Sequence, residues 1–385
     1  MRPPRWRSAI GNHQGLFVRD APILVTGGAG FIGSALVRHL VLERGLPVVT
    51  VDALTYAGHL SSLGEAANSP LHAFERADVA NAAQVEAVLR RHQPRAIMHL
   101  AAESHVDRSI DGPAAFVHTN VVGTFTLLEQ STRYWNAAPP EIRRDFRFLH
   151  VSTDEVFGAL DDTGRFSLAS PYRPSSPYAA SKAASDHFAR AWHHTYGLPV
   201  IVTNCSNNYG PYQYPEKLIP VAVRRALALE TIPVYGSGQQ VRDWLHVEDH
   251  ARGLVAALER GALGRTYLFG GGAERTNLEV VGAICDAVDA IAPVGVPRRS
   301  LIAHVTDRPG HDFRYAIDAS RSTTELGWSA SRPFDDGLRE TVAWYAANQG
   351  WVAQVLRAGD DGGRIGLGTR AGGAVGVESG VGVAA

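Results

Sequence analysis

The residue types best suited to acid–base chemistry lie together at the end of one apolar stretch. The run 148–151 (FLHV) has the character of a buried strand, and it leads into Thr153, Asp154 and Glu155. Adjacent carboxyl groups in a partly dry site can have pKa values that are pushed apart, so that one group supplies a proton while the other removes one. An acidic dipeptide more often forms a solvated or helix-capping pair, but the position after a buried strand favours catalysis here.

A second pair of reactive residues is Tyr178 and Lys182. Their spacing of four positions places both on one face of a helix. A nearby ammonium group stabilises a phenolate, so we expect Lys182 to lower the pKa of Tyr178 from its usual value of about 10. Such a tyrosine could take a proton from a hydroxyl group. The spacing is common by chance, but Lys182 and Lys217 are the only lysines among 37 basic residues, which favours a chemical role for each.

The glycine-rich run 26–33 (TGGAGFIG) indicates how a cofactor could be held beside these groups. It follows a buried-type strand at 23–25 and precedes a helix expected over 34–44, which is the context of a dinucleotide-binding turn rather than of a merely structural one. Asp52 ends the next strand, 19 residues after Gly33, where its carboxylate would bond a ribose hydroxyl and repel a 2′-phosphate. The pattern therefore predicts NAD rather than NADP as the cofactor.

The elements that must position these groups alternate between apolar strands and helices. Strands are expected at 23–25, 48–51, near 73, at 96–100, 146–151 and 200–202, and helices at 34–44, 82–91, 113–134 and 178–196. Continuous apolar strands joined by helices predict an α/β fold, a doubly wound parallel sheet of the Rossmann type with a smaller C-terminal lobe.

The domain organisation expected from these patterns has four parts. We expect a loose extension at 1–20, an NAD-binding domain at 21–205, a substrate-binding lobe at 206–350, and a disordered tail at 359–385, where ten of the last 27 residues are Gly. Elements between about 240 and 270, including a helix at 249–260, could either return to the sheet or belong to the second lobe.

Composition excludes several classes of function. A net charge of −1 leaves no basic field for nucleic acid, and no run reaches the roughly 18 apolar residues of a membrane span. Cys205 and Cys285 show neither a disulfide framework nor metal-type spacing, which fits a reducing cytoplasm. The acids between His246 and His250 are typical of a helix start, so no metal site is expected. The start of the chain, 1–17, resembles a transit peptide only faintly.

Over residues 22–348 the chain resembles the extended short-chain dehydrogenase/reductase family and, within it, the dTDP-glucose 4,6-dehydratases. The stretches that carry this resemblance are 26–33 (TGGAGFIG), 51–58 (VDALTYAG), 99–109 (HLAAESHVDRS), 148–158 (FLHVSTDEVFG), 203–211 (TNCSNNYGP), 242–244 (RDW) and 307–312 (DRPGHD), together with Tyr178 and Lys182. Phe157 stands where the family commonly has Tyr, so the ring is kept and only a hydroxyl is lost.

The resemblance implies a mechanism on a sugar bound as a nucleotide diphosphate. Tyr178 would remove the proton of the C4 hydroxyl while Thr153 holds the C4 oxygen. Glu155 would remove the C5 proton, and Asp154 would protonate the departing C6 hydroxyl, so that water leaves. A homodimer formed through the helices near 113–134 and 178–196 is also implied.

The resemblance assigns further residues to the two ligands. The cofactor would contact Gly27, Gly30, Phe31, Ile32, Gly33, Asp52, Ala53, Leu54, Thr55, Asp78, Val79, Leu100, Ala101, Ala102, Thr119, Tyr178, Lys182 and Asn208. The substrate would contact Ser104, Thr153, Asn207, Lys217, Leu218, Pro233, Tyr235, Arg242, Asn277, Arg308 and His311.

Three alternatives stay open at this point. A nucleotide-sugar 4-epimerase or decarboxylase would share the cofactor, Tyr178 and Lys182, but epimerisation needs neither a C5 base nor a C6 acid. Another nucleotide-sugar 4,6-dehydratase would differ only in the base or sugar that it selects. A non-catalytic, dinucleotide-sensing protein would not require Tyr178, Lys182 and the acidic pair together.

Overall fold

A seven-stranded parallel sheet forms the centre of the computed structural model, which describes residues 21–358. Its strand order is β10-β6-β5-β4-β1-β2-β3. The strands are β1 (Ile23–Thr26), β2 (Val48–Asp52), β3 (His72–Arg76), β4 (Ala96–His99), β5 (Arg147–Thr153), β6 (Val200–Cys205) and β10 (Thr266–Phe269). The chain runs outward from β1 to β3 and then crosses back to β4, so the order reverses between β1 and β4. Ligands bind at such a switch point in open α/β sheets.

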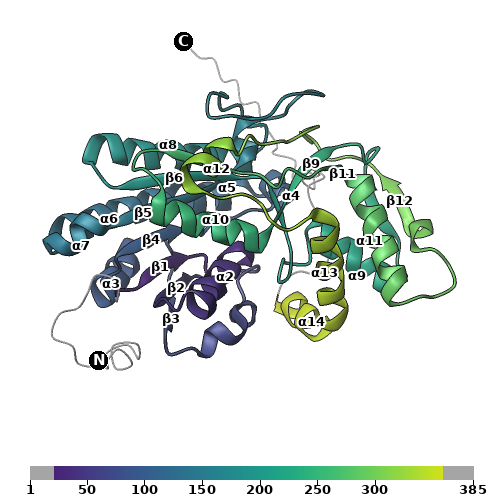
Figure 1. The fold of residues 1–385 in the computed structure, drawn as a ribbon, viewed down its shortest axis with the longest axis horizontal. Helices are drawn as coiled ribbons and strands as arrows, with labels where there is room; N and C mark the ends of the chain where they lie inside the picture. The colour runs from purple at the N-terminus through teal and green to yellow at the C-terminus, as the bar shows by residue number, and fades with distance from the viewer. Residues whose placement is uncertain (1–20, 359–385) are drawn as a thin grey trace, which may run out of the picture.

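Helices cover both faces of this sheet, which confirms the predicted doubly wound fold (Figure 1). On one face α2 (Phe31–Arg38) packs against α10 (Val247–Arg260). On the other face α6 (Thr124–Ala137) packs against both α3 (Ala82–His92) and α8 (Pro177–Tyr196). Buried side chains fill both layers, which explains why the strands read as continuous apolar runs.

Two predicted helices are less regular than their sequence pattern indicates. The helix expected from residue 34 begins at Phe31 and ends in a π-helical turn, η2 (His39–Glu43). The helix expected over 113–134 consists of α5 (Pro113–Phe116), a π-helical segment η4 (Val117–Gly123) and α6. A Cβ on Gly123 would lie 2.8 Å from a methyl of Val79, so η4 passes close to the chain that follows β3. Single π turns of this kind occur often at functional sites.

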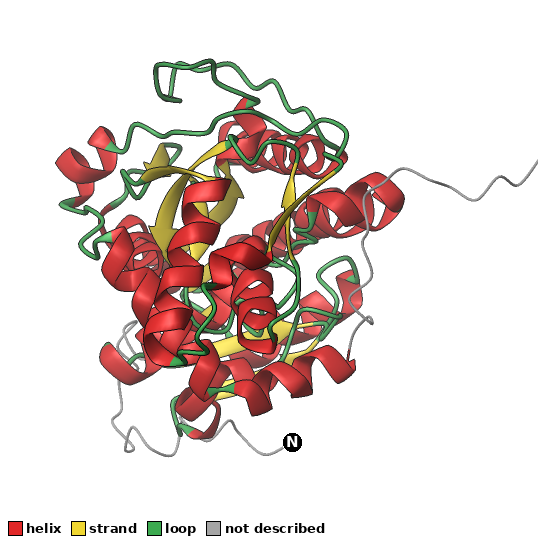
Figure 2. Cartoon of the chain, turned by 90° about the vertical axis from the view of Figure 1, so that its right-hand side faces the viewer, coloured by secondary structure: helices red, strands yellow, loops and turns green. Residues whose placement is uncertain are grey.

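The second lobe has its own small sheets and core (Figure 1). One sheet contains β7 (Asn207–Tyr209), β9 (Val241–His246) and β11 (Glu274–Thr276), and the other contains β8 (Ile232–Tyr235) and β12 (Ile302–Val305). Its helices are α9 (Leu218–Ala228), α11 (Asn277–Ile291), α13 (Phe334–Ala347) and α14 (Gln349–Ala358). Figure 2 views the molecule from the side of this lobe.

The two lobes share chain segments within the range 206–350. β10 pairs with β6 at the edge of the large sheet, and α10 packs on that sheet, whereas the segments on either side of them belong to the second lobe. The chain therefore crosses between the lobes more than once. The extension and tail expected at 1–20 and 359–385 lie outside the described residues.

Shorter elements complete the described chain. They are η3 (Leu60–Asn68), α4 (Val106–Asp111), α7 (Pro140–Asp145), η5 (Asp154–Phe157), η6 (Arg298–Leu301) and α12 (Ser320–Leu326). Within residues 21–358, no helix has the length and apolar character needed to cross a membrane. The same residues contain no group of three or more His, Cys, Asp or Glu side chains placed to hold a metal ion.

Candidate active site

The glycine-rich turn between β1 and α2 is packed too closely to accept side chains. A Cβ on Gly33 would lie 2.1 Å from the Gly27 carbonyl oxygen, and one on Gly27 would lie 2.6 Å from the Ala101 backbone nitrogen. Gly27 also has a φ of +67°, which favours glycine. The turn therefore brings bare backbone and the start of α2 to the ends of β1 and β4. Such a turn fits a pyrophosphate group.

Asp52, at the end of β2, is held against this turn. Its Oδ2 accepts a hydrogen bond from the Ala29 backbone N–H at 3.0 Å, and its Oδ1 accepts one from the Leu54 N–H at 2.8 Å. Burial raises the pKa of Asp52, and the two backbone hydrogen bonds oppose that rise. Each carboxylate oxygen keeps a lone pair for a ribose hydroxyl, and the fixed negative charge would repel a 2′-phosphate. The residues present therefore fit NAD.

The other residues predicted to contact the cofactor follow several strands of the same sheet. The backbone N–H groups of Leu100 and Ala101, after β4, lie 3.2 and 3.3 Å from Thr26 Oγ1. Asp78, after β3, accepts a hydrogen bond from the Ala80 N–H at 2.8 Å. The remaining positions are Gly30, Phe31 and Ile32 at the start of α2, Ala53 and Thr55 beyond β2, Val79, Ala102, and Thr119 on η4. Asn208 lies on β7, and its amide oxygen is 2.9 Å from His250 Nδ1.

The acidic pair lies where the sequence predicts, at the carboxyl end of β5. Thr153 caps the short helix η5, because its Oγ1 accepts a hydrogen bond from the Glu155 N–H at 3.3 Å. The same hydroxyl group donates to Asp154 Oδ1 at 3.3 Å. The other carboxyl oxygen of Asp154 is buried and has no hydrogen-bond partner among the described residues. A buried polar atom without a partner is rare in proteins and marks a position where a ligand group could bind.

The surroundings of the two carboxyl groups differ. Burial raises the pKa of Asp154 well above its usual range, and the negative charges of Glu155 and Asp243 raise it further. Burial also raises the pKa of Glu155, but the positive charges of Arg308, Lys217 and Arg242 oppose that rise. Asp154 is therefore suited to carry a proton and Glu155 to accept one, as an acid and a base must.

The tyrosine–lysine pair is in place, but the predicted pKa shift is wrong. Tyr178 and Lys182 are both buried on α8, and the Tyr178 hydroxyl forms a hydrogen bond with Thr153. Burial and the charge of Glu155 raise the pKa of Tyr178 well above its usual value. The ammonium group of Lys182 donates to the Val151 carbonyl oxygen at 2.9 Å, and the pKa of Tyr178 stays above its usual value despite this lysine on the same helix. The phenol therefore keeps its proton in this structure.

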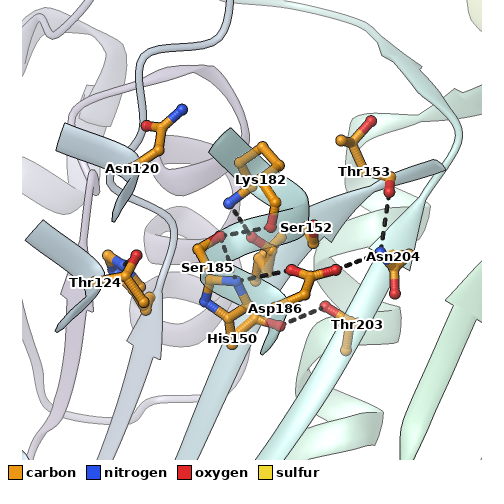
Figure 3. A network of polar contacts seen from close by, with 12 residues as sticks. Asn120, Thr124, His150, Ser152, Thr153, Lys182, Ser185, Asp186, Thr203 and Asn204 are labelled. Carbon is orange, nitrogen blue, oxygen red and sulfur yellow. Dashed lines mark hydrogen bonds and ion pairs between the residues drawn. The ribbon is translucent and has the colours of Figure 1, made fainter. Parts of the chain in front are cut away.

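A buried polar network that the sequence reasoning missed lies beneath this corner (Figure 3). Asp186, one turn beyond Lys182, lies with its Oδ1 3.0 Å from His150 Nε2. The Asn204 amide donates to the Thr153 carbonyl oxygen at 3.0 Å and to Asp186 Oδ2 at 3.1 Å. Extending the four-residue spacing of Tyr178 and Lys182 by one step would have found Asp186. No spacing in the sequence indicates Asn204.

Several predicted substrate residues surround Glu155 from the second lobe. Lys217 donates to the Ser104 carbonyl oxygen at 2.9 Å, so it joins the lobe to the segment after β4. Arg308 forms an ion pair with Asp107 Oδ1 at 2.8 Å, and the Tyr235 hydroxyl lies 3.3 Å from the other oxygen of Asp107. These contacts bring together four of the predicted substrate residues, which are Ser104, Lys217, Tyr235 and Arg308.

Arg242, which the resemblance assigns to the substrate, is held by backbone carbonyl groups. It donates hydrogen bonds to the carbonyl oxygens of Val241, Phe313 and Asp312, and it lies over the ring of Tyr315 with 4.3 Å between the guanidinium carbon and the ring centroid. Its charge still lowers the pKa of both Asp154 and Glu155.

The remaining residues predicted to contact the substrate lie around the second lobe. His311 Nδ1 is 2.7 Å from Asp307 Oδ1, and Asn207 has a buried amide oxygen without a hydrogen-bond partner among the described residues. Leu218 begins α9, Asn277 begins α11 and Pro233 lies on β8.

The burial of Asp154 predicts a pH-dependent gain in stability for Asp154→Asn. A carboxyl group whose folded pKa is raised contributes stability below its unfolded pKa and loses it as the pH rises through the folded pKa. Asparagine stays neutral, so the variant should unfold at a higher urea concentration than the parent at pH 8, with a gap that narrows toward pH 5. Urea titrations at both pH values measure this gap. Asp162→Asn, at an exposed position, should leave the urea concentration of unfolding unchanged at both pH values. A difference between Asp154→Asn and the parent that does not depend on pH would contradict the burial account.

The close packing of the glycine turn predicts that Gly33→Ala weakens dinucleotide binding. The added methyl group would meet the Gly27 carbonyl oxygen, so the turn must open. We expect the Kd for NAD to rise about tenfold or more, which corresponds to a loss of about 1.4 kcal/mol. Fluorescence titration measures it. Gly350→Ala adds the same methyl group in open space on α14 and should leave the affinity unchanged.

Comparison with known proteins agrees with this geometry. Residues 24–341 match the family model described as GDP-mannose 4,6 dehydratase. A dTDP-glucose 4,6-dehydratase of Xanthomonas campestris is 57% identical over 335 residues, which cover 86% of this chain and 95% of that protein. The dTDP-glucose 4,6-dehydratase 1 of Escherichia coli K12 is 53% identical over 342 residues, with the same coverage of both chains.

Solved structures of nucleotide-sugar enzymes are also similar to this chain. The crystal structure of DesIV, a dTDP-glucose 4,6-dehydratase from Streptomyces venezuelae with NAD bound, has a TM-score of 0.80 and 44% identity, and the match covers 87% of this chain and 99% of that one. A UDP-glucose 4-epimerase from Thermus thermophilus in complex with NAD has a TM-score of 0.75 and 29% identity, with 85% and 99% coverage. The sequence identity is higher to the dehydratases, and the chain belongs to the dTDP-glucose 4,6-dehydratase family.

Proposed function

We propose that this chain converts dTDP-glucose into dTDP-4-keto-6-deoxyglucose and water, with NAD as a cofactor that ends the cycle in its starting form. The observation that carries this proposal is the pair of carboxyl groups at the end of β5 and next to Tyr178, formed by the buried Asp154 and the partly buried Glu155. Epimerisation at C4 requires neither group as a C5 base or a C6 acid, whereas elimination of water across C5 and C6 requires both.

The cofactor would lie against the glycine turn, with Asp52 at its ribose. When bound, NAD supplies the hydride acceptor for C4 and the hydride donor for C6. The side chains of this chain hold the sugar and move its protons. Tyr178 must be ionised to take the proton of the C4 hydroxyl, and the positive charge of the oxidised nicotinamide would oppose the rise in its pKa once the cofactor is bound. The Thr153 hydroxyl, which already bonds Tyr178, would hold the C4 oxygen.

Elimination follows once C4 is a ketone, because a neighbouring carbonyl acidifies the C5 proton. Glu155 takes that proton, and the partly opposed rise of its pKa favours the ionised form required of a base. Asp154 gives its proton to the C6 oxygen, which leaves as water. Glu155 exchanges the proton it has taken with solvent and then protonates C5 as C6 receives its hydride. The proton that Tyr178 took from the C4 hydroxyl passes through solvent to Asp154, so Tyr178 and both carboxyl groups regain their starting forms.

The nucleotide diphosphate would be held by cations of the second lobe. Lys217 and Arg308 contact the segment after β4 and the start of α4, so a diphosphate bound by them would join both lobes. Guanidinium groups suit phosphate oxygens because they donate two parallel hydrogen bonds. Tyr235 beside them would contact the base. We place the reaction in a reducing cytoplasm, since Cys205 and Cys285 are both free and buried.

Glu155→Gln tests the assignment of the two half-reactions. The variant should still oxidise C4, which appears as bound NADH absorbing at 340 nm, but should form no 4-keto-6-deoxy product from dTDP-glucose. Loss of the Glu155 charge should also lower the pKa of Tyr178, so C4 oxidation should begin at a lower pH than in the parent.

The parent chain should yield the 4-keto-6-deoxy product by NMR, and Glu141→Gln, on the exposed surface of α7, should behave like the parent. Ordinary turnover by Glu155→Gln would remove Glu155 from the mechanism. Conversion of UDP-glucose or GDP-mannose in place of dTDP-glucose by the parent would change the substrate assignment.

We also propose a homodimer formed through η4, α6 and α8. Val117, Val122 and Phe125 are 53%, 41% and 39% exposed, and Tyr196 is 54% exposed. Phe125 contacts Trp192 across the two helices, with ring centroids 5.7 Å apart, which makes a continuous aromatic surface with Tyr196. Exposed apolar patches of this kind mark protein–protein contacts.

Phe125→Glu tests this interface. A charge at the centre of an apolar contact would be desolvated without a partner, so the variant should be a monomer by light scattering where the parent is a dimer. Leu263→Glu introduces the same charge at another residue that is 43% exposed and should stay dimeric. A parent chain that is monomeric at micromolar concentration would contradict the proposal.

A further inference from the structure

The Asp186 carboxylate is fully buried, and the proposed reaction gives it no direct role. It accepts a hydrogen bond from the Asn204 amide at 3.1 Å and lies 3.0 Å from His150 Nε2 (Figure 3). The Tyr172 hydroxyl also donates to it at 2.7 Å. Burial would raise the pKa of Asp186, but the contacts with His150 and Tyr172 and the charge of Lys182 lower it to about 2. The group is therefore ionised at any working pH.

Stability alone does not explain a charge at this position. Taking an ion out of water is expensive, and replacing a buried ionic cluster with apolar residues of similar volume is often neutral or stabilising. His150, Tyr172 and Asn204 all contact this one carboxylate. The arrangement indicates that the charge itself is needed by a neighbouring group.

That neighbour is Lys182. Burial lowers the pKa of Lys182, and Asp186 is the strongest influence that raises it. The other titratable groups around Lys182 are His99 on β4, His150 on β5 and Cys205 on β6. Burial lowers the pKa of both histidines and raises the pKa of the Cys205 thiol, so all three are neutral near pH 7. Asp186, one helical turn along α8 from Lys182, is thus the ionised group of this set that acts on it.

Asp186 also reaches the acidic pair through one side chain. The Asn204 amide group bridges Asp186 Oδ2 and the Thr153 carbonyl oxygen, which belongs to the peptide bond directly before Asp154. Lys182 holds the same strand two residues earlier, through the Val151 carbonyl oxygen. Both contacts fix the end of β5, from which Thr153, Asp154 and Glu155 project.

We propose that Asp186 is a positioning residue, which keeps Lys182 charged on the Val151 carbonyl oxygen and, through Asn204, fixes the peptide that carries the acidic pair. The catalytic part of this proposal rests on the proposed function. The electrostatic part does not, because the charge of Lys182 can be measured without substrate.

The test uses the fact that the chain contains two lysines, Lys182 and Lys217. Lysine labelled with 13C at Cε should therefore give two signals by NMR, which Lys182→Arg assigns. In Asp186→Asn the Lys182 signal should titrate at least about one pH unit lower than in the parent, since a buried ion partner shifts a pKa by this amount or more. The Lys217 signal should not move and serves as the internal reference.

Tyr172→Phe is the matched control. It removes one hydrogen bond from Asp186 but leaves the carboxylate charged, so the Lys182 titration should stay within about 0.3 pH units of the parent, well below the shift of a lost ion partner. A Lys182 titration that is the same in the parent and in Asp186→Asn would overturn the electrostatic part, whatever the enzyme does with dTDP-glucose.

Steady-state kinetics test the catalytic part of the proposal. With dTDP-glucose, Asp186→Asn should lose about tenfold in kcat at pH 8, with KM within about twofold, and should regain activity as the pH falls and Lys182 is protonated again. A merely structural defect would lower kcat equally at all pH values, and that result would overturn the catalytic part. If the parent itself does not turn over dTDP-glucose, the proposed function fails while the NMR result still decides the charge of Lys182.

Asn204→Ser keeps the test decisive should Asp186→Asn fail to fold. This variant breaks the bridge to the Thr153 carbonyl oxygen and leaves the Asp186 charge in place. We expect kcat to fall with the Lys182 titration unchanged. An unchanged kcat would overturn the role of the bridge, and a shifted Lys182 titration would show that Asp186 does not set the charge of Lys182 on its own.

Discussion

The exclusion of water from ionisable side chains is the constraint on which this site depends. Asp154, Tyr178, Lys182 and Asp186 are all buried at the carboxyl end of β5 or against it, where an unpaired charge is costly. The fold meets that cost in two ways. Asp186 is ionised and fully partnered, whereas Asp154 is left without a second partner and holds a proton instead. The chemistry that we propose uses the proton on Asp154. The charge on Asp186 supports that chemistry by holding the end of β5.

The doubly wound sheet explains why these groups can meet a cofactor and a sugar at one place. Its strand order reverses between β1 and β4, and the glycine turn, the strand ends and the acidic pair all face that switch point. The second lobe brings Lys217 and Arg308 against the segment after β4, so its cations act on Glu155. The difference between the two adjacent carboxyl groups therefore arises from packing between lobes.

The sequence predicted the sheet, the glycine turn and the acidic strand end well, because each depends on local periodicity or on glycine's lack of a side chain. It did not decide whether β10 returns to the large sheet, since a short apolar strand carries no information about its partner. The predicted pKa shift of Tyr178 was wrong for a similar reason. Helical spacing places Lys182 on the face of Tyr178, but the direction of its ammonium group is set by the Val151 carbonyl oxygen on another element. The backbone contacts of Arg242 are equally invisible in the sequence.

The central claim is that one buried corner carries out both hydride transfer and elimination on the same sugar. Isotope labels test it most directly. With dTDP-glucose deuterated at C4, product formed in ordinary water should carry that deuterium at C6, and unlabelled substrate in heavy water should gain deuterium at C5. Loss of the C4 label to solvent, or retention of the original C5 hydrogen with no solvent label, would contradict the account.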